Sequence, residues 1–261
     1  MFKHGRMERN MKVLSIGNSF TQDANYYLHQ IGEAAGVENE LVNLVIGGCP
    51  LEKHWNNMQT GEKEYEIEVN GVNREPERRV SIKEILMEQD WDVIVTQQAS
   101  HDSGLADTYE PFLGQMLDFF HEYEPNAKVL LNETWAYEPD STHPCFDRYD
   151  HSTQKMYECL HEAYYTAAEK HDLSVIPSGT LIQKIRATEE YSNGTRSICR
   201  DGFHMDLIYG RYAVGCMWAK CIFGITLKDN AYIPETEYLP GVKPEMGIID
   251  MIKSLVDDCQ I

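Results

Sequence analysis

Short apolar runs alternate along the chain with longer stretches in which apolar residues recur at helical spacing. Continuous apolar runs are typical of parallel strands that are buried on both faces. The segment Glu64–Val80 is charged and holds Asn70-Gly71 between alternating residues, so we expect a hairpin or a long excursion there rather than core. We predict five buried strands, at Met11–Ile16, Glu40–Ile46, Trp91–Thr96, Lys128–Asn132 and Leu173–Ile176.

Helical patterns fill the spaces between these strands. Tyr27, Leu28 and Ile31 share one helical face, for example, and Gly36 follows where that helix should end. Strands and helices in strict alternation form right-handed β-α-β units, so we expect an α/β fold with one three-layer α/β/α domain around a five-stranded parallel sheet. The predicted helices are Ala24–Ala35, Ser81–Gln89, Glu110–Tyr123, His151–Lys170, Thr180–Thr188, Met205–Phe223 and Glu245–Val256, with a polar loop over 189–203.

No linker-like run of Gly, Ser or Pro and no internal repeat divides the chain. We therefore expect residues 1–261 to form a single domain, with an insertion at about 60–80 and a C-terminal helical extension at 229–261.

Composition then narrows the class of partner. The chain carries 23 Lys and Arg against 42 Asp and Glu, a net charge of −19. Such a surface repels phosphate backbones and anionic lipid, so we expect neither nucleic acid nor a membrane as partner. Residues 1–10 lack the apolar stretch of a secretory signal, and charged residues interrupt the most apolar stretch, 205–224. Seven cysteines without zinc-like spacing indicate reduced thiols, so we expect a cytoplasmic protein with no metal.

Polar residues follow several predicted strands at their carboxyl ends, where open α/β sheets place their functional residues. Ser19 lies between the first strand and the first helix, where its N–H can stabilise a developing anion. The alternative is that Ser19 or Thr21 only caps that helix. The G-x-S-x-G and G-x-G-x-x-G motifs are both absent here.

Asp201 and His204 end the long loop before the late helix. Residues three apart can meet within one turn, so the carboxylate can fix the imidazole tautomer and leave the other nitrogen free as a base. A surface histidine beside a capping aspartate is the alternative, and Asp206 is a rival for the carboxylate role. After the second strand, Gly48 can offer an unobstructed N–H or serve as an ordinary turn glycine. Cys49 has few basic neighbours to lower its pKa, which disfavours it as a nucleophile.

Two further loops carry candidate binding residues. Gln97-Gln98-Ala99-Ser100 ends the third strand, and buried amides there need hydrogen-bond partners. Trp135 and Tyr137 follow the fourth strand and suit a pocket wall, although aromatics that close the edge of the core are an equal alternative. We expect the substrate pocket to include Asn18, Gln97, Ser100, Trp135 and Tyr137.

Together these blocks resemble the SGNH (GDSL-like) hydrolase superfamily and, within it, the bacterial DUF4886 family, from Lys12 to about Gly224. The first block, I-G-N-S-F-T, places the nucleophile of the family on Ser19, with Asn18 where the family name has Asp. The second-block glycine falls on Gly48, and the last block, D-x-x-H, falls on Asp201 and His204. Many members have G-x-N-D as the third block, but this chain has Q-Q-A-S. We assign the missing amide to Gln98, with Gln97 and Ser100 as alternatives.

The resemblance implies a flavodoxin-like fold and an esterase without a cofactor. Ser19, His204 and Asp201 would form the triad, and the oxyanion hole would comprise the N–H groups of Ser19 and Gly48 with the Gln98 amide. By analogy, the substrate is a small-molecule or carbohydrate ester, such as an O-acetyl sugar. Two other hypotheses remain: a non-catalytic ligand- or glycan-binding protein on the same fold, and a flavodoxin-like binder of phosphate or nucleotide.

Overall fold

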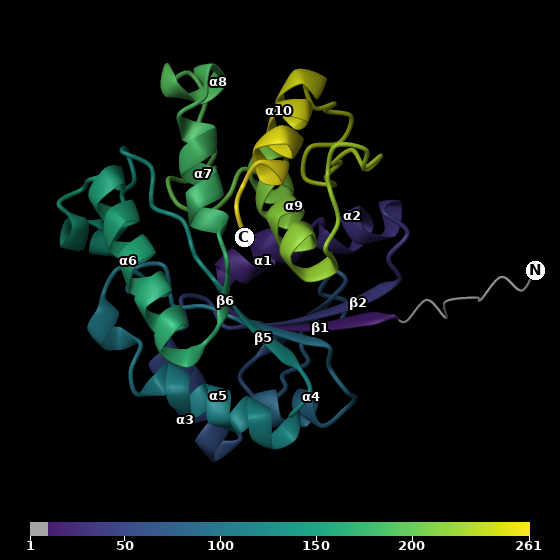
Figure 1. Ribbon diagram of the computed structural model, residues 1–261, viewed down its shortest axis with the longest axis vertical. Helices are drawn as coiled ribbons and strands as arrows, with labels where there is room; N and C mark the ends of the chain where they lie inside the picture. The colour runs from purple at the N-terminus through teal and green to yellow at the C-terminus, as the bar shows by residue number, and fades with distance from the viewer. Residues whose placement is uncertain (1–9) are drawn as a thin grey trace, which may run out of the picture.

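A six-stranded sheet forms the centre of the protein in a computed structural model that describes residues 10–261 (Figure 1). Residues 1–9 lie outside this range. They include most of the segment that we expected to lack a secretory signal, and the start of the expected domain. The sheet order is β3-β2-β1-β4-β5-β6. The strands are β1 Met11–Gly17, β2 Asn39–Val45, β3 Glu66–Val69, β4 Val93–Thr96, β5 Lys128–Asn132 and β6 Ser174–Ile176.

Five of these strands are parallel and correspond to the five predicted from the sequence. The sixth, β3, comes from the segment expected to be a hairpin or an excursion, and it pairs antiparallel with β2. Asn70 and Gly71 form the turn at its end, where Val69 bridges to Val72. Tyr65 and Ile67 are buried, so this segment extends the sheet and contributes to the core. The expectation of a five-stranded sheet is therefore wrong by this one edge strand.

Helices cover both faces of the sheet, which confirms the predicted α/β layers (Figure 1). One face carries α3 Leu51–Thr60, α4 Ile82–Leu86 and α5 Phe112–Tyr123. The other carries α1 Ser19–Asn25, α2 Leu28–Ala34, α7 Ser178–Arg186, α9 Tyr209–Phe223 and α10 Met246–Asp257. The helix α6 Thr153–His171 lies beside the edge strand β6, and the short helix α8 Glu189–Ser192 occupies part of the predicted loop.

The helices α1 and α9 begin at different residues from those predicted. The first begins at Ser19 rather than Ala24, because the Oδ1 atom of Asn18 accepts the N–H of Phe20 at 3.1 Å and caps the helix. The predicted single helix is in fact two, α1 and α2. The helix predicted from Met205 begins at Tyr209 instead.

Like the short α8, the longer helix α3 was not predicted. Its buried positions are Leu51, His54, Asn57 and Met58, so polar and apolar residues share the inward face. Leu51, Trp55 and Met58 do recur at helical spacing, but the polar His54 and Asn57 lie among them, and this mixed pattern was not assigned to a helix.

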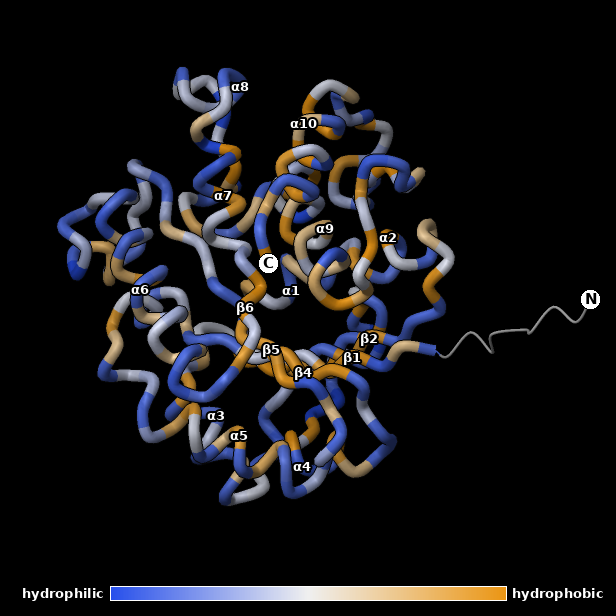
Figure 2. The backbone as a smooth tube through the Cα atoms, in the orientation of Figure 1, coloured by the Kyte–Doolittle hydropathy of each residue, from blue (hydrophilic) through white to orange (hydrophobic). Residues whose placement is uncertain are grey.

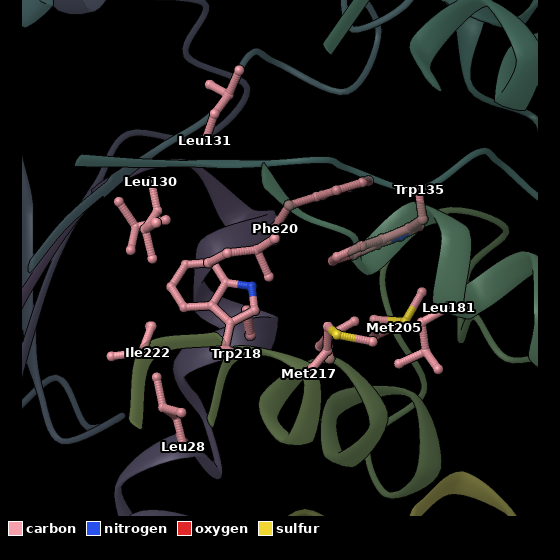
Figure 3. Close-up of a cluster of buried hydrophobic side chains, with 14 of the residues drawn as sticks. Phe20, Leu28, Leu130, Leu131, Trp135, Leu181, Met205, Met217, Trp218 and Ile222 are labelled. Carbon is pink, nitrogen blue, oxygen red and sulfur yellow. The ribbon is translucent and has the colours of Figure 1, made fainter. Parts of the chain in front are cut away.

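The core lies on both sides of the apolar central strands, which show as the orange middle of the tube in Figure 2. On the α1 and α9 side, Phe20, Trp135 and Trp218 are the large buried rings (Figure 3). α9 is buried along nearly its whole length against α1, α2, α7 and α10. Over residues 10–261, no helix has the length and apolar character needed to span a membrane.

Candidate active site

Ser19, His204 and Asp201 lie in a hydrogen-bonded line, although 185 positions separate the first two. The Nε2 atom of His204 is 2.8 Å from the Oγ atom of Ser19. Its Nδ1 atom is 2.7 Å from the Oδ2 atom of Asp201. With Nδ1–H donating to the carboxylate, Nε2 is left as the acceptor for the serine proton, which is the arrangement of a nucleophile, a base and an orienting acid.

The local sequence explains why the Ser19 hydroxyl is available. Asn18, not Ser19 or Thr21, caps α1, so Ser19 is the first helical residue and keeps its hydroxyl for His204. In the opposite segment, Gly202 has a φ of +88°, and a Cβ atom there would lie 2.9 Å from the Cα of Ser141. Only glycine fits this tight turn between the acid and the base.

The carboxylate of Asp201 is held in its charged form by the same loop. Partial burial opposes ionisation, but the His204 ring and the N–H groups of His204 and Phe203 donate to the carboxylate and together hold its pKa below the ordinary value. The rival carboxylate, Asp206, has a different role. Its Oδ1 atom accepts the N–H groups of residues 208–210 at the start of α9.

A buried carboxylate one helical turn beyond Ser19 joins the two halves of the site. Asp23 is fully buried, and its Oδ2 atom accepts the N–H of Met205 at 2.8 Å. Its Oδ1 atom accepts from Arg200 at 2.9 Å and from Arg211 at 2.8 Å. Asp23 therefore fixes the segment that carries His204 against the helix that carries Ser19.

The loop after β2 lies beside the nucleophile loop, since Asn18 Nδ2 donates to the carbonyl of Cys49 at 3.3 Å. Within residues 10–261, neither the N–H of Ser19 nor that of Gly48 donates to a protein acceptor, so both are available to a ligand. Cys49 is a poor nucleophile, because burial raises the pKa of its thiol to about 12. The adjacent ring, His54, is also buried, and burial lowers its pKa to about 3.

The Gln98 amide does not point to the site as expected. Its Nε2 group donates to the carbonyl and to the hydroxyl of Thr108, both at 3.0 Å. Its Oε1 atom accepts the N–H groups of Leu51 at 3.0 Å and Ala99 at 2.8 Å. This amide ties together three loops on the α3 face, so the prediction that it donates into an oxyanion hole is not supported by its geometry.

Gln97 lies instead in a chain of buried polar groups beneath Ser19. Its Nε2 group donates to Asn18 Oδ1 at 3.0 Å, and its Oε1 atom accepts from Asn132 Nδ2 at 2.7 Å. Asn132 Oδ1 in turn accepts from Ser178 at 2.7 Å and from Trp218 at 3.0 Å. Asn18 and Gln97 are therefore supports of the nucleophile loop rather than walls of an open pocket.

The aromatic residues after β5 are also supports, in contrast to the expected pocket wall. Trp135 and Tyr137 are both fully buried. The Trp135 ring stacks on Phe20 at 4.1 Å, as Figure 3 shows, and its Nε1–H donates to the carbonyl of Phe203 at 2.7 Å. Tyr137 bonds the hydroxyl of Ser100 at 2.8 Å, and Ser100 is itself buried. These rings close the edge of the core and brace the loop that precedes His204.

The sequence reasoning missed Asp23 and Asn132, and it gave no role to two histidines near the base, of which only His143 was noted, beyond the loop after the fourth strand. The rings of His101 and His143 stack at 6.0 Å, and His143 lies edge-on to Phe203 at 5.1 Å. Burial, with the nearby charges of His101, His204 and Arg148, lowers the pKa of His143. Over residues 10–261, no group of three or more His, Cys, Asp or Glu side chains is arranged to hold a metal ion.

Comparisons with known proteins identify the family of this chain. The family model "Domain of unknown function (DUF4886)" matches residues 12–239. The crystal structure of a DUF4886 family protein from Bacteroides uniformis is 33% identical, with a TM-score of 0.85, over 96% of this chain and 94% of that one. A search of curated proteins finds no match.

More distant structures share the fold. A candidate SGNH hydrolase from Slackia heliotrinireducens is 20% identical, with a TM-score of 0.56, over 81% of this chain and 98% of that one. A catalytic mutant of an acetylxylan esterase from Geobacillus stearothermophilus is 11% identical, with a TM-score of 0.52, over 88% of this chain and 100% of that one. The resemblance inferred from the sequence blocks is thereby confirmed: the chain belongs to the DUF4886 family and has the fold of the SGNH hydrolases.

Proposed function

We propose that this protein is a serine esterase that hydrolyses carboxylic esters through an acyl-enzyme on Ser19. The observation that carries the proposal is the unbroken line from Asp201 through His204 to the Ser19 hydroxyl, with bonds of 2.7 and 2.8 Å. A helix cap alone would not need a histidine on the serine hydroxyl, nor a carboxylate behind that histidine.

In the first step, His204 Nε2 takes the proton of Ser19 while Oγ attacks the ester carbonyl. The resulting tetrahedral oxyanion accepts the N–H groups of Ser19 and Gly48, and the N-terminus of α1 adds favourable partial charge. His204 then passes its proton to the leaving alcohol, which departs and leaves an acyl group on Ser19. Water repeats the cycle with His204 as base, releasing the acid. Asp201 stays charged throughout and holds the ring in place.

The two backbone N–H groups are the oxyanion donors that the hydrogen-bonding pattern supports. Since the Gln98 amide is already bonded to Thr108, we propose no side-chain donor from the loop after β4. One donor fewer costs a factor of about 10²–10³ in rate, so we expect a slower esterase than one with a third donor.

For the substrate, we propose an O-acetyl ester of a carbohydrate. The support is the acetylxylan esterase among the proteins of the same fold, together with the lining of the cavity beside Ser19, whose side chains are largely polar or tyrosine.

The test is turnover of p-nitrophenyl acetate by the wild-type protein and by Ser19→Ala. Removing the nucleophile should lower kcat by about 10⁵–10⁶ if the acyl-enzyme route operates. Ser192→Ala, on the exposed end of α8, is the matched control and should leave the rate unchanged. Equal rates for wild type and Ser19→Ala would contradict the proposal and favour a non-catalytic binding protein. Thermal stabilisation by FMN or a nucleotide would instead favour the phosphate-binding alternative.

A further inference from the structure

A cavity of about 550 Å³ opens beside Ser19. Its floor is one continuous face of α1, α2 and the turn between them, and Ser19 is the first residue of that face. The volume is within the range of sites that hold drug-sized ligands, and it is far larger than an acetyl group requires. The floor residues are Ser19, Gln22, Asp23, Tyr26, Tyr27 and Gln30, which follow helical spacing.

Both walls come from segments outside the five parallel strands of the sheet. One wall is the β3 strand and turn, residues 66–73, and the other is the segment 232–238 before α10. Gly71 has a φ of +79°, and a Cβ atom there would lie 2.8 Å from the carbonyl oxygen of Tyr26, so only glycine lets the turn approach the floor. The Tyr26 hydroxyl bonds the hydroxyl of Thr236 at 3.1 Å and joins the floor to the second wall.

The cavity presents hydrogen-bonding groups already held in place. The carboxyl group of Glu68 accepts from Gln22 and from Asn43, both at 2.8 Å, and burial raises its pKa. Arg211 is only 9% exposed, and its Nε atom donates to Asp23 at 2.8 Å. Its Nη1 atom is buried and has no partner among the residues described. A fixed carboxyl and a partly unpaired guanidinium suit the hydroxyl groups of a sugar.

The tyrosines argue against a cationic ligand. The Arg211 guanidinium already lies over the ring of Tyr26 at 4.2 Å and faces Tyr238 at 5.8 Å. Two of the four lining tyrosine rings, those of Tyr26 and Tyr238, are therefore already engaged by a cation of the protein itself, which weakens them as a site for an ammonium group.

The charges argue against an anionic ligand. Glu66, Glu68, Glu235 and Glu237 line the walls, and of these Glu66 is paired with Arg79 at 3.0 Å. The two lining arginines, Arg200 and Arg211, both bind the buried Asp23. A carboxylate on the sugar would thus meet a surplus of negative charge.

We infer that this cavity binds the neutral sugar portion of an acetylated carbohydrate while the ester carbonyl lies at Ser19. The inference rests on the proposed esterase function and adds the place, the binding residues and the charge preference of the sugar site. It assigns a specificity role to the β3 turn and to the segment 232–238.

The test compares kcat/KM for methyl 2-O-acetyl-glucoside, which keeps three free hydroxyl groups, with kcat/KM for p-nitrophenyl acetate. The ratio should fall at least tenfold in Tyr238→Ala, mainly through KM for the sugar ester. Tyr238 is 59% exposed, so its removal should not disturb folding. Tyr165→Ala, which removes a 40% exposed tyrosine from α6, should keep the wild-type ratio. The wild-type protein should also prefer the glucoside ester to the matching acetylated methyl glucuronide and to acetylcholine.

An unchanged ratio in Tyr238→Ala, or a preference for either charged ester, would overturn the inference. If p-nitrophenyl acetate turnover is nevertheless lost in Ser19→Ala, only the sugar site is refuted and the proposed esterase function stands. If turnover does not depend on Ser19, calorimetry decides the cavity separately. Methyl 2-O-acetyl-glucoside should then bind Ser19→Ala at least tenfold more tightly than it binds the double variant Ser19→Ala/Tyr238→Ala, and equal or undetectable binding would refute the sugar site.

Discussion

The loops after β1 and β4 leave neighbouring parallel strands at the same edge of the sheet, and both are rich in polar side chains. After β1, Asn18 satisfies the helix N-terminus and leaves the Ser19 hydroxyl to His204. After β4, Gln97 and Gln98 both direct their amides to buried partners. One loop thus presents a reactive group, while the other holds the surrounding loops together.

This difference shows that a polar residue at the carboxyl end of a strand is available for chemistry only when other groups satisfy the local backbone. In the first loop an asparagine takes the capping bond that a serine would otherwise make. In the second, both amides bond to protein groups that join strands and loops, as buried amides require.

The largest expected effect is a loss of kcat on substitution of Asp201, in the loop that carries His204. Asp201→Asn should lower kcat for p-nitrophenyl acetate by about 10³–10⁴, because the amide would stabilise the wrong histidine tautomer. Asp229→Asn, an exposed acid remote from the site, is the control and should retain full activity. A loss below tenfold in Asp201→Asn would mean that His204 acts without an orienting carboxylate.

The next effect concerns the buried polar chain beneath Ser19. Gln97→Leu leaves Asn132 Nδ2 without its partner and removes a bond to Asn18, so the free energy of unfolding should fall by about 1–3 kcal/mol. Urea denaturation measures this loss. The exposed Gln154→Leu on α6 should change the free energy of unfolding by less than about 0.5 kcal/mol. Equal stability of Gln97→Leu and wild type would show that the chain of amides is not a structural support.

A smaller effect on rate is expected at the neighbouring position. Gln98→Ala should reduce stability, because Leu51 N–H and Thr108 lose their partner, but kcat should stay within tenfold of wild type. Steady-state kinetics on folded protein measures this. A fall of 10²–10³ in kcat, the scale of one lost oxyanion donor, would indicate that the amide turns toward the substrate during the reaction.

The smallest effect is a pH dependence of stability. The folded pKa of Asp201 lies below its ordinary value, about 3.9, so its charged form stabilises the fold above that pH and this contribution disappears as pH falls through the folded pKa. Asp201→Asn should therefore have a lower urea midpoint than wild type from pH 7 to about pH 5. The gap should close only in more acidic solution. A gap that closes between pH 7 and pH 6 would assign the effect to another group.

Much of the fold could be predicted because its signals are local. The five parallel strands are continuous apolar runs, and most helices carry a regular apolar face. The helix α3 was missed, since the inward-facing His54 and Asn57 interrupt its apolar positions Leu51, Trp55 and Met58. The β3 strand was taken for an excursion because its outer side is charged, although Tyr65 and Ile67 are buried.

The candidate site was only partly predictable for a related reason. The serine, the glycine of the second loop and the D-x-x-H block have recognisable spacing. The partners of an amide, in contrast, depend on residues far along the chain, such as Thr108 for Gln98 and Asn132 for Gln97. Trp135 and Tyr137 have the composition of a pocket wall, and only tertiary packing places them in the core.

The central claim is that His204 activates Ser19, and a fluorophosphonate probe tests it most directly. Intact-mass and peptide analysis should find one phosphonyl group on Ser19 of the wild-type protein, and the labelling rate should fall by at least two orders of magnitude in His204→Ala. A label on another residue, or equal labelling of Ser19 in both proteins, would contradict the account.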